Sequence, residues 1–397
     1  MTGSAPVRLA VVGADHPHVF QLVDSLVKVG VEAAAHTTAG DLVSAYGKWR
    51  PESRPLPLER IFGDDSIDLI VAAGIPSERA DVAEAAIDAG KWVLSPKPGV
   101  TTREQLDRLS AKVSGHPRQA GNPGQAGQPG RSVRRGRPWT VLCTERFENR
   151  AVAGAIAMAR DGAVGRVVHV AGSGPHSLFR DRRPDWFWDP QRSGGILVDI
   201  GAHQVDEFLA VIWPDGGLGP GAGFGAGTGV GAGPEVGAST GVGAGTGVGV
   251  GRAVEIRSAS VGNVSCPDRP AMQDIGAMSL SANGVQGDLR VDYLSPAGLD
   301  SWGDVRLTIT GTAGTLEARA NLDVAGEPGP EHLLLVDHSG TSRVDLSGVE
   351  VDWAARLMAD MADGTETLMP QAQVIDVCDI TLRAQQVATR WGSQDRT

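Results

Sequence analysis

The residues best suited to chemistry are Asp199 and His203, in the sequence GGILVDIGAHQVD at residues 194–206. They are four residues apart, so on a helix they share one face. Gly201 lies between them and would let a ligand approach. An imidazole held by a carboxylate among apolar neighbours is a good general acid–base group. The alternative is a structural histidine whose hydrogen bonds are satisfied within the fold.

A second candidate is Lys97, in the sequence SPKP at residues 95–98, directly after a short apolar run. If that run is a parallel strand, the lysine lies at its carboxyl end, where such sheets bind ligands. Pro96 and Pro98 would hold the loop stiff. The alternative is a surface lysine in a rigid turn.

A third candidate is the sequence GADHPH at residues 13–18, after the first apolar run. A dinucleotide fingerprint has the form G-x-G-x-x-G at this position, but Asp15 and His18 replace its second and third glycines. The following helix would still offer N–H groups to a phosphate, and His16 or His18 could donate to it. Asp15 would repel a phosphate unless it caps the helix. A plain strand-to-helix turn is the alternative.

Composition limits the other possibilities. Two histidines two residues apart make a poor zinc pattern, and Cys143, Cys266 and Cys378 show no paired spacing, so we expect neither a metal site nor disulfides. The net charge of −11 argues against nucleic acid as a partner. The apolar run after Arg8 is too short to span a bilayer, so we expect no membrane contact and a cytoplasmic location.

These candidates must be positioned by two kinds of sheet. Before residue 110, short apolar runs alternate with helical patterns, which predicts a Rossmann-type, doubly wound parallel sheet. The later segments predict an α+β part with an open, mostly antiparallel sheet. We therefore expect two domains, residues 1–148 and 149–397, with a last helix over 373–390 that returns toward the first domain. The expected strands are 7–12, 31–35, 68–73, 92–94, 140–143, 167–171, 254–260, 277–281, 287–293, 305–311, 315–318 and 333–336; the other expected helices are 18–29, 77–89, 151–160 and 196–212.

Two segments differ in composition from the rest. Residues 114–138 are rich in Gly, Pro, Gln and Arg, and residues 215–251 are about half glycine. Neither has enough large apolar side chains to build a core, so we expect a disordered basic loop and a flexible insert.

The order and spacing of the motifs resemble the Gfo/Idh/MocA family, the glucose–fructose oxidoreductase and inositol dehydrogenase group. The resemblance covers nearly the whole chain apart from the two inserts. It rests on the strand and turn at residues 7–18, A-x-x-A-x-x-A-G-K-x-V-x-x-x-K-P at 83–98, TERF at 144–147, D-G-x-x-G-x-V at 161–167 and G-G-x-x-x-D-x-G-x-H at 194–203.

The resemblance implies a role for each matching residue. Lys97 would lie by the nicotinamide of NAD or NADP, and Asp199 and His203 would form the acid–base pair, with His203 as proton donor or acceptor. Gly13 corresponds to the first fingerprint glycine. The cofactor-binding residues would be Gly13, Asp15, His16, His18, His36, Gly74, Ile75, Pro76 and Lys97; those on the substrate side would be His176, Trp186 and Trp188.

Three departures from the family pattern bear on the cofactor. Pro96 stands where the family usually has Glu, and two fingerprint glycines are missing. The second strand ends in Ala35-His36-Thr37-Thr38, without an acidic residue for a ribose hydroxyl, so the choice between NAD and NADP stays open.

The resemblance implies an NAD(P)-dependent oxidoreductase that acts by hydride transfer on a sugar, cyclitol or related polyol, and we expect a homo-oligomer. Two alternatives are a non-catalytic ligand sensor of the same fold and an NAD-dependent glycosidase.

Overall fold

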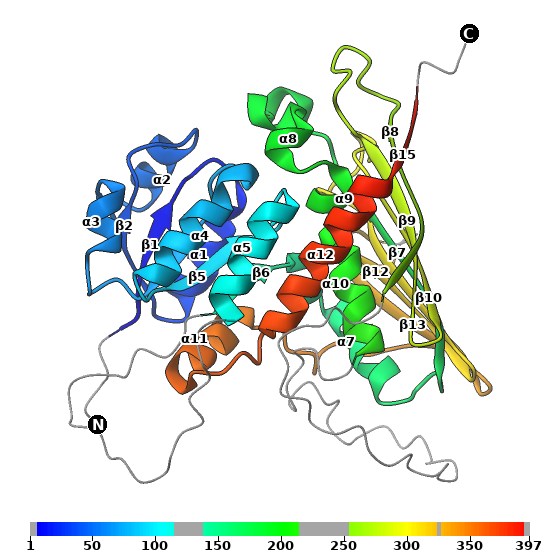
Figure 1. Cartoon of the computed structure of the whole chain (residues 1–397). Helices are drawn as coiled ribbons and strands as arrows, with labels where there is room; N and C mark the ends of the chain where they lie inside the picture. The colour runs from blue at the N-terminus through cyan, green and yellow to red at the C-terminus, as the bar shows by residue number, and fades with distance from the viewer. Residues whose placement is uncertain (1–5, 115–137, 214–253, 324–326, 393–397) are drawn as a thin grey trace, which may run out of the picture.

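The computed structural model describes residues 6–114, 138–213, 254–323 and 327–392. Two sheets lie on either side of helix α12 (Gln371–Val387), as Figure 1 shows. The insert at 215–251 falls outside the described residues. So does the loop at 114–138, except that Ser114 ends a helix and Pro138 precedes a strand.

The first sheet has six parallel strands in the order β3-β2-β1-β4-β5-β6. This is the Rossmann order, in which the strand sequence reverses between β1 and β4. The apolar runs RLAVV and LIVA become β1 and β4 because a parallel strand covered on both faces has no polar side. The strands are β1 (Arg8–Val12), β2 (Glu32–His36), β3 (Arg54–Pro55), β4 (Leu69–Ala72), β5 (Trp92–Pro96) and β6 (Trp139–Leu142).

The second sheet has nine strands in the order β14-β13-β12-β11-β7-β10-β9-β8-β15 and is mostly antiparallel, as predicted. Among the described strands of this second sheet, only the pairs β7–β10 and β8–β15 are parallel. Side chains alternate between buried and exposed along β10, as a sheet covered on one face requires. The strands are β7 (Val167–Pro175), β8 (Glu255–Asn263), β9 (Ile275–Ala282), β10 (Val285–Asp292), β11 (Val305–Gly311), β12 (Gly314–Ala320), β13 (Glu331–Asp337), β14 (Gly340–Arg343) and β15 (Thr389–Gly392).

Helices cover one face of the second sheet and both faces of the first sheet. The helices α7, α9, α10 and α12 pack on the second sheet, while α1 and α4 pack on the first. The helices are α1 (His18–Lys28), α2 (Val43–Trp49), α3 (Leu58–Phe62), α4 (Arg79–Asp88), α5 (Arg103–Ser114), α6 (Thr144–Glu148), α7 (Arg150–Arg160), α8 (Pro190–Ser193), α9 (Ile196–Asp199), α10 (Gly201–Ile212), α11 (Trp353–Asp363) and α12. None of these described helices is long and apolar enough to cross a membrane.

The last helix returns to the first sheet, as expected, but its end was predicted wrongly. It packs against α5 and β6, and Gln371 exchanges hydrogen bonds with the backbone N–H and C=O of Trp139. The helix stops at Val387, and Thr389 and Arg390 belong to β15. They extend because β15 pairs with the edge strand β8, so a tertiary partner overrides the helical pattern.

The predicted division between residues 148 and 149 falls between α6 and α7. The side chain of Asn149 caps α7 by accepting a hydrogen bond from the Val152 N–H. That the two parts are separate domains remains a prediction.

Candidate active site

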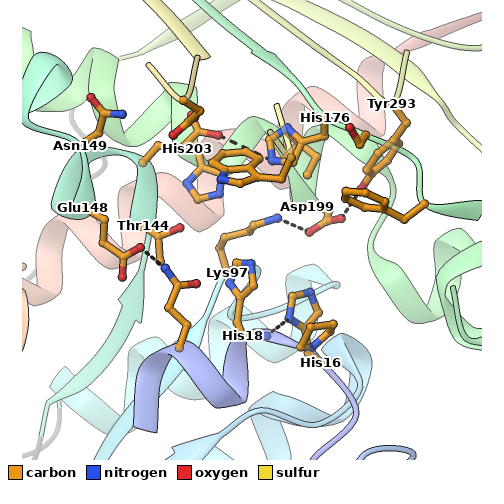
Figure 2. A pocket seen from close by; sticks show the side chains of 18 of the residues that line it. His16, His18, Lys97, Thr144, Glu148, Asn149, His176, Asp199, His203 and Tyr293 are labelled. Atoms are coloured by element: carbon orange, nitrogen blue, oxygen red, sulfur yellow. Dashed lines mark hydrogen bonds and ion pairs between the residues drawn. The ribbon is translucent and has the colours of Figure 1, made fainter. Parts of the chain in front are cut away.

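A cleft of about 370 Å³ opens between the carboxyl ends of the parallel strands and the second sheet. Figure 2 shows Lys97 reaching up between the histidines of the first turn and His176 and His203. The lining residues are His16, Pro17, His18, Gln21, Lys97, Thr144, Glu145, Glu148, Asn149, His176, Ser177, Phe179, Arg183, Asp199, Ile200, His203, Tyr293, Trp302 and Asn321.

The centre of the cleft is an ion pair between Lys97 and Asp199. Lys97 lies at the end of β5 and is 3% exposed, and its Nζ donates to Asp199 Oδ1 over 2.8 Å. The Tyr293 hydroxyl donates to Asp199 Oδ2 over 2.7 Å. Both carboxylate oxygens therefore have strong donors, and three elements far apart in the sequence meet at one group.

The ion pair decides the protonation state of Asp199. Burial by itself would raise the pKa of this carboxyl group. The charge of Lys97 and the hydrogen bonds from Lys97 and Tyr293 outweigh burial, so the pKa of Asp199 lies below its ordinary value. Asp199 is a carboxylate near neutral pH and compensates the buried ammonium group.

The expected support of His203 by Asp199 is absent. The two residues are one helical turn apart, but Asp199 ends α9 and turns to Lys97, while the buried His203 Nδ1 has no hydrogen-bond partner among the described residues. A Cβ on Gly201 would come within 3.0 Å of the Met278 side chain, so this glycine serves helix-to-sheet packing instead of ligand access.

The histidines of the cleft are neutral near pH 7. Burial lowers the pKa of His203 and His16 well below the ordinary value, and it lowers the pKa of His18 and His176 to about 3, with the charge of Lys97 adding to the shift in each case. We had expected a neighbouring carboxylate to stabilise a charged His203. Instead, the cleft presents neutral imidazoles, which can accept a proton or donate a lone pair.

Arg79, in the first turn of α4, holds the loop that carries Lys97. Its Nη1 donates to the carbonyl oxygens of Pro96, Lys97 and Pro98 over 3.0, 3.0 and 2.9 Å, and its Nε donates to Gly74 O over 2.9 Å. The guanidinium is 1% exposed, and burial lowers the pKa of Arg79 to about 10. It thereby links the turn after β4 to the turn after β5.

The turn at residues 13–18 lies at the point where the strand order reverses. Gly13 has a φ of +71°, and a Cβ there would lie 2.5 Å from Gly74 Cα, so only glycine allows the two turns to meet. The Gly13 N–H donates to Thr37 Oγ1, while the N–H groups of Asp15 and His16 donate to Ala73 O. Asp15 Oδ1 accepts a hydrogen bond from the Asp41 N–H over 2.8 Å.

These contacts test how a dinucleotide would fit. The crevice at the reversal point and the buried Lys97 match the nicotinamide end. At the phosphate end the backbone N–H groups of Gly13, Asp15 and His16 are engaged, and Pro17 has none. The His18 ring faces the cleft, and its buried Nδ1 has no partner among the described residues. The residues therefore fit a dinucleotide whose phosphates are met by side chains of the turn.

The remaining predicted residues lie at different distances from the cleft. His36 is buried at the end of β2, with its Nδ1 3.0 Å from Ser53 Oγ. Pro76 begins a short turn after β4, next to Ile75. His176 lines the cleft, whereas Trp186 packs behind His16 with ring centres 6.0 Å apart, and Trp188 lies near Arg180 and Arg269. Neither tryptophan is among the lining residues.

Sequence reasoning missed Tyr293, Arg79 and Glu145. Tyr293 is one of only two tyrosines in the chain, and it is the last residue of an expected strand, which is a usable but weak signal. Glu145 belongs to the TERF motif of the family resemblance, yet nothing local to it indicated a place in the cleft. Arg79 lies in a helix whose other residues gave no indication of a functional role.

Comparisons with known proteins agree with this architecture. Residues 152–212 match the model of the GFO/IDH/MocA C-terminal domain. A candidate oxidoreductase from Erwinia carotovora atroseptica SCRI1043 has 28% sequence identity and a TM-score of 0.78, over 97% of this chain and 99% of its own. No curated protein matches the chain.

Two more distant structures share the fold. A candidate oxidoreductase from Thermotoga maritima has 16% identity and a TM-score of 0.70, over 96% of this chain and 98% of its own. KijD10, a 3-ketoreductase from Actinomadura kijaniata solved with NADP and TDP-benzene, has 15% identity and a TM-score of 0.68, over 98% of this chain and 100% of its own.

Proposed function

Since the chain belongs to the Gfo/Idh/MocA family of oxidoreductases, we propose that it exchanges a hydride between NAD(H) or NADP(H) and a sugar, cyclitol or related polyol. The observation that carries the proposal is the buried Lys97–Asp199 ion pair, capped by Tyr293, at the carboxyl end of β5. A buried lysine held in this way is a positioned donor for the oxygen of a carbinol or carbonyl group.

The dinucleotide would lie across the reversal point of the first sheet. Gly13 and Gly74 allow the two turns to approach there, and the side chains of His16 and His18 would meet the phosphates. The bound nicotinamide supplies or accepts the hydride. The end of β2 offers no acidic side chain and His36 is turned to Ser53, so binding of both cofactor forms has to be measured.

The residues of the cleft would divide the remaining work. Lys97 would donate to the substrate oxygen and stabilise negative charge that develops on it, with Asp199 and Tyr293 fixing its position. The neutral His203 would accept the hydroxyl proton during oxidation and return it during reduction. A low pKa keeps His203 unprotonated at the start of oxidation, and it makes the protonated imidazole a strong acid that returns the proton during reduction.

A small polyhydroxylated substrate suits the lining of the cleft. Arg183, Asn321, Ser177 and Thr144 offer polar contacts around the central ion pair. The Trp302 ring lies 4.7 Å from the His176 ring and is 40% exposed, which leaves an aromatic face at the opening. KijD10, which shares the fold, is a 3-ketoreductase, and a keto group is the kind of carbonyl that this hydride transfer would reduce.

The proposal is tested by titrating the full chain with NADH and NADPH and then assaying a panel of polyols and ketoses. We expect binding of at least one cofactor and turnover of at least one substrate. His203→Ala should lower turnover by about 10² to 10⁴ while cofactor binding survives, as for loss of a general base. Lys97→Ala should damage both turnover and substrate affinity.

Two results would contradict this assignment. If neither cofactor binds at millimolar concentration, the proposed oxidoreductase function is wrong. A folded His203→Ala protein with wild-type turnover would exclude the acid–base role, whereas a lower melting temperature with an unchanged rate would mark His203 as a packing residue.

We also propose a homo-oligomer in the cytoplasm. The face of the nine-stranded sheet that the helices leave open in Figure 1 is the surface on which copies would meet. Light scattering on the purified protein measures the mass directly, and a monomer at micromolar concentration would contradict this part of the proposal.

A further inference from the structure

Three metal-ligating side chains meet in the wall of the cleft, and they come from three different segments. Glu145 lies in α6, His176 directly follows β7, and His203 lies in the first turn of α10. One ligand atom from each lies within 4.8 Å of the other two. His176 Nε2 and Glu145 Oε1 lie 3.8 Å apart.

Two of these side chains have buried polar atoms without a partner. Glu145 is 4% exposed and His203 is 2% exposed, and neither Glu145 Oε1 nor His203 Nδ1 forms a hydrogen bond among the described residues. Leaving a buried polar atom unsatisfied lowers stability, so native structures rarely keep one without a reason. A ligand between the three side chains would supply that reason.

The surroundings hold His176 and Glu145 in orientations that suit a metal ion. His176 Nδ1 is 3.0 Å from Gly174 O, so Nδ1 carries the ring proton and donates to that carbonyl, which leaves the Nε2 lone pair on the side of Glu145. Gln204 Nε2 donates to Glu145 Oε2 over 2.6 Å and leaves Oε1 free. Metal-ligating histidines and carboxylates usually have such outer partners.

We propose that Glu145, His176 and His203 form a binding site for a divalent transition-metal ion such as Zn²⁺. Two imidazoles and one carboxylate are a common set of three protein ligands for zinc, with a fourth position left for water or substrate. Ligand atoms around tetrahedral zinc lie about 3.4 Å apart, so the present cluster must contract by about 1 Å. Burial raises the pKa of Glu145 to about 8, so an ion that binds here at neutral pH would displace the proton of this carboxyl group.

Occupation of this site has a consequence for the reaction, and that consequence rests on the proposed function. A histidine bound to a metal through its lone pair cannot use that lone pair to accept a proton. A bound ion would therefore compete with the acid–base role of His203. The site would make hydride transfer sensitive to free zinc.

Calorimetric titration of the full, chelator-treated chain with Zn²⁺ tests the site directly. We expect one ion per chain, a raised melting temperature by linkage, and at least tenfold weaker binding in both Glu145→Gln and His176→Gln. His169→Gln is the matched control, because His169 lies on β7, outside the cluster, and is half-buried and paired with Asp288. Co²⁺ as a second probe should give the visible absorption of a four- or five-coordinate ion in the wild type only.

The outcomes separate the two proposals. Absence of stoichiometric Zn²⁺ binding, or equal binding by the wild type and both cluster variants with normal melting curves, overturns the metal site. Equal weakening in His169→Gln would assign the binding to surface histidines and also overturn it. Cofactor titration without metal tests the oxidoreductase proposal independently, so either proposal can fail alone.

Discussion

Asp15 is the residue that most distinguishes the first turn from an ordinary dinucleotide fingerprint. The second fingerprint glycine normally lets the backbone approach the pyrophosphate, and Asp15 puts a carboxylate at that position. Asp15 Oδ1 accepts a hydrogen bond from the Asp41 N–H, so this side chain links the segment after β2 to the turn after β1. A neutral side chain of the same shape could keep this contact without repelling a phosphate.

We therefore predict that Asp15→Asn binds NADH or NADPH more tightly than the wild type, by about three- to tenfold, which is about 1 kcal/mol. The amide oxygen can still accept from the Asp41 N–H, while the negative charge is lost. Fluorescence titration with each cofactor measures the change. Asp41→Asn serves as the control, since it removes a nearby exposed charge and leaves the Asp15 carboxylate; weaker binding by Asp15→Asn would show that this carboxylate holds the cofactor.

Arg79 determines where Lys97 stands, although it does not line the cleft. Replacing it with Met leaves several buried carbonyl oxygens without donors, at about 1–3 kcal/mol each. We expect Arg79→Met to lower the free energy of unfolding by at least about 3 kcal/mol and to reduce turnover more than cofactor affinity. Denaturant melts and steady-state kinetics measure both effects.

The control for this prediction is Arg60→Met, on the exposed surface of α3. Arg79→Lys should recover part of the stability, because one ammonium group can donate to the same carbonyls. Unchanged stability in Arg79→Met would mean that the loop at residues 96–98 is held by other contacts.

Among the elements, Glu148 joins three helices. It ends α6, accepts from Trp353 Nε1 at the start of α11 over 3.0 Å, and accepts from Gln21 of α1. Burial raises the pKa of Glu148 to about 7, despite the opposing hydrogen bond from Trp353. The accepted hydrogen bonds favour the carboxylate, but burial outweighs them, so the folded chain favours the protonated carboxyl group below about pH 7.

The raised pKa fixes the sign of the pH dependence. Between about pH 4.5 and 7 the folded chain keeps a proton that the unfolded chain has released, so stability falls as pH rises, by at most about 1.4 kcal/mol per unit for this group. We predict that Glu148→Gln makes the decline in unfolding free energy from pH 5 to 8 shallower. Melts at each pH test this, and Glu59→Gln on exposed α3 should behave as wild type; parallel curves for Glu148→Gln would contradict it.

For the whole molecule, the sequence predicts that residues 114–138 and 216–250 are dispensable. Their composition offers few large apolar side chains, and the entropy of closing a loop changes slowly with its length. Replacing either segment with a short Gly/Ser linker should leave the melting temperature and cofactor affinity nearly unchanged. A fall of more than a few degrees would show that the segment contributes to the core.

The local pattern was sufficient for most of the two sheets. Buried parallel strands such as β1 and β4 must be apolar on both faces, and strands such as β10 must alternate, so both kinds leave a direct trace in the sequence. Lys97 was identifiable because it follows a buried strand, where ligands bind in this fold. The helices α5 and α11 and the strand β14 were among the elements missed, although α5 has apolar residues at helical spacing, Leu106, Leu109 and Val113.

The partners of the site residues were decided only by the tertiary structure. Asp199 has a histidine one turn away, and the sequence favoured that pair, yet its oxygens bind Lys97 and Tyr293, which are 102 and 94 residues distant. The cluster of Glu145, His176 and His203 could not be predicted from the spacing of these residues in the sequence either. Local sequence determines backbone conformation and burial; which side chains face each other depends on how the two sheets pack around α12, because that packing alone brings distant segments within hydrogen-bonding distance.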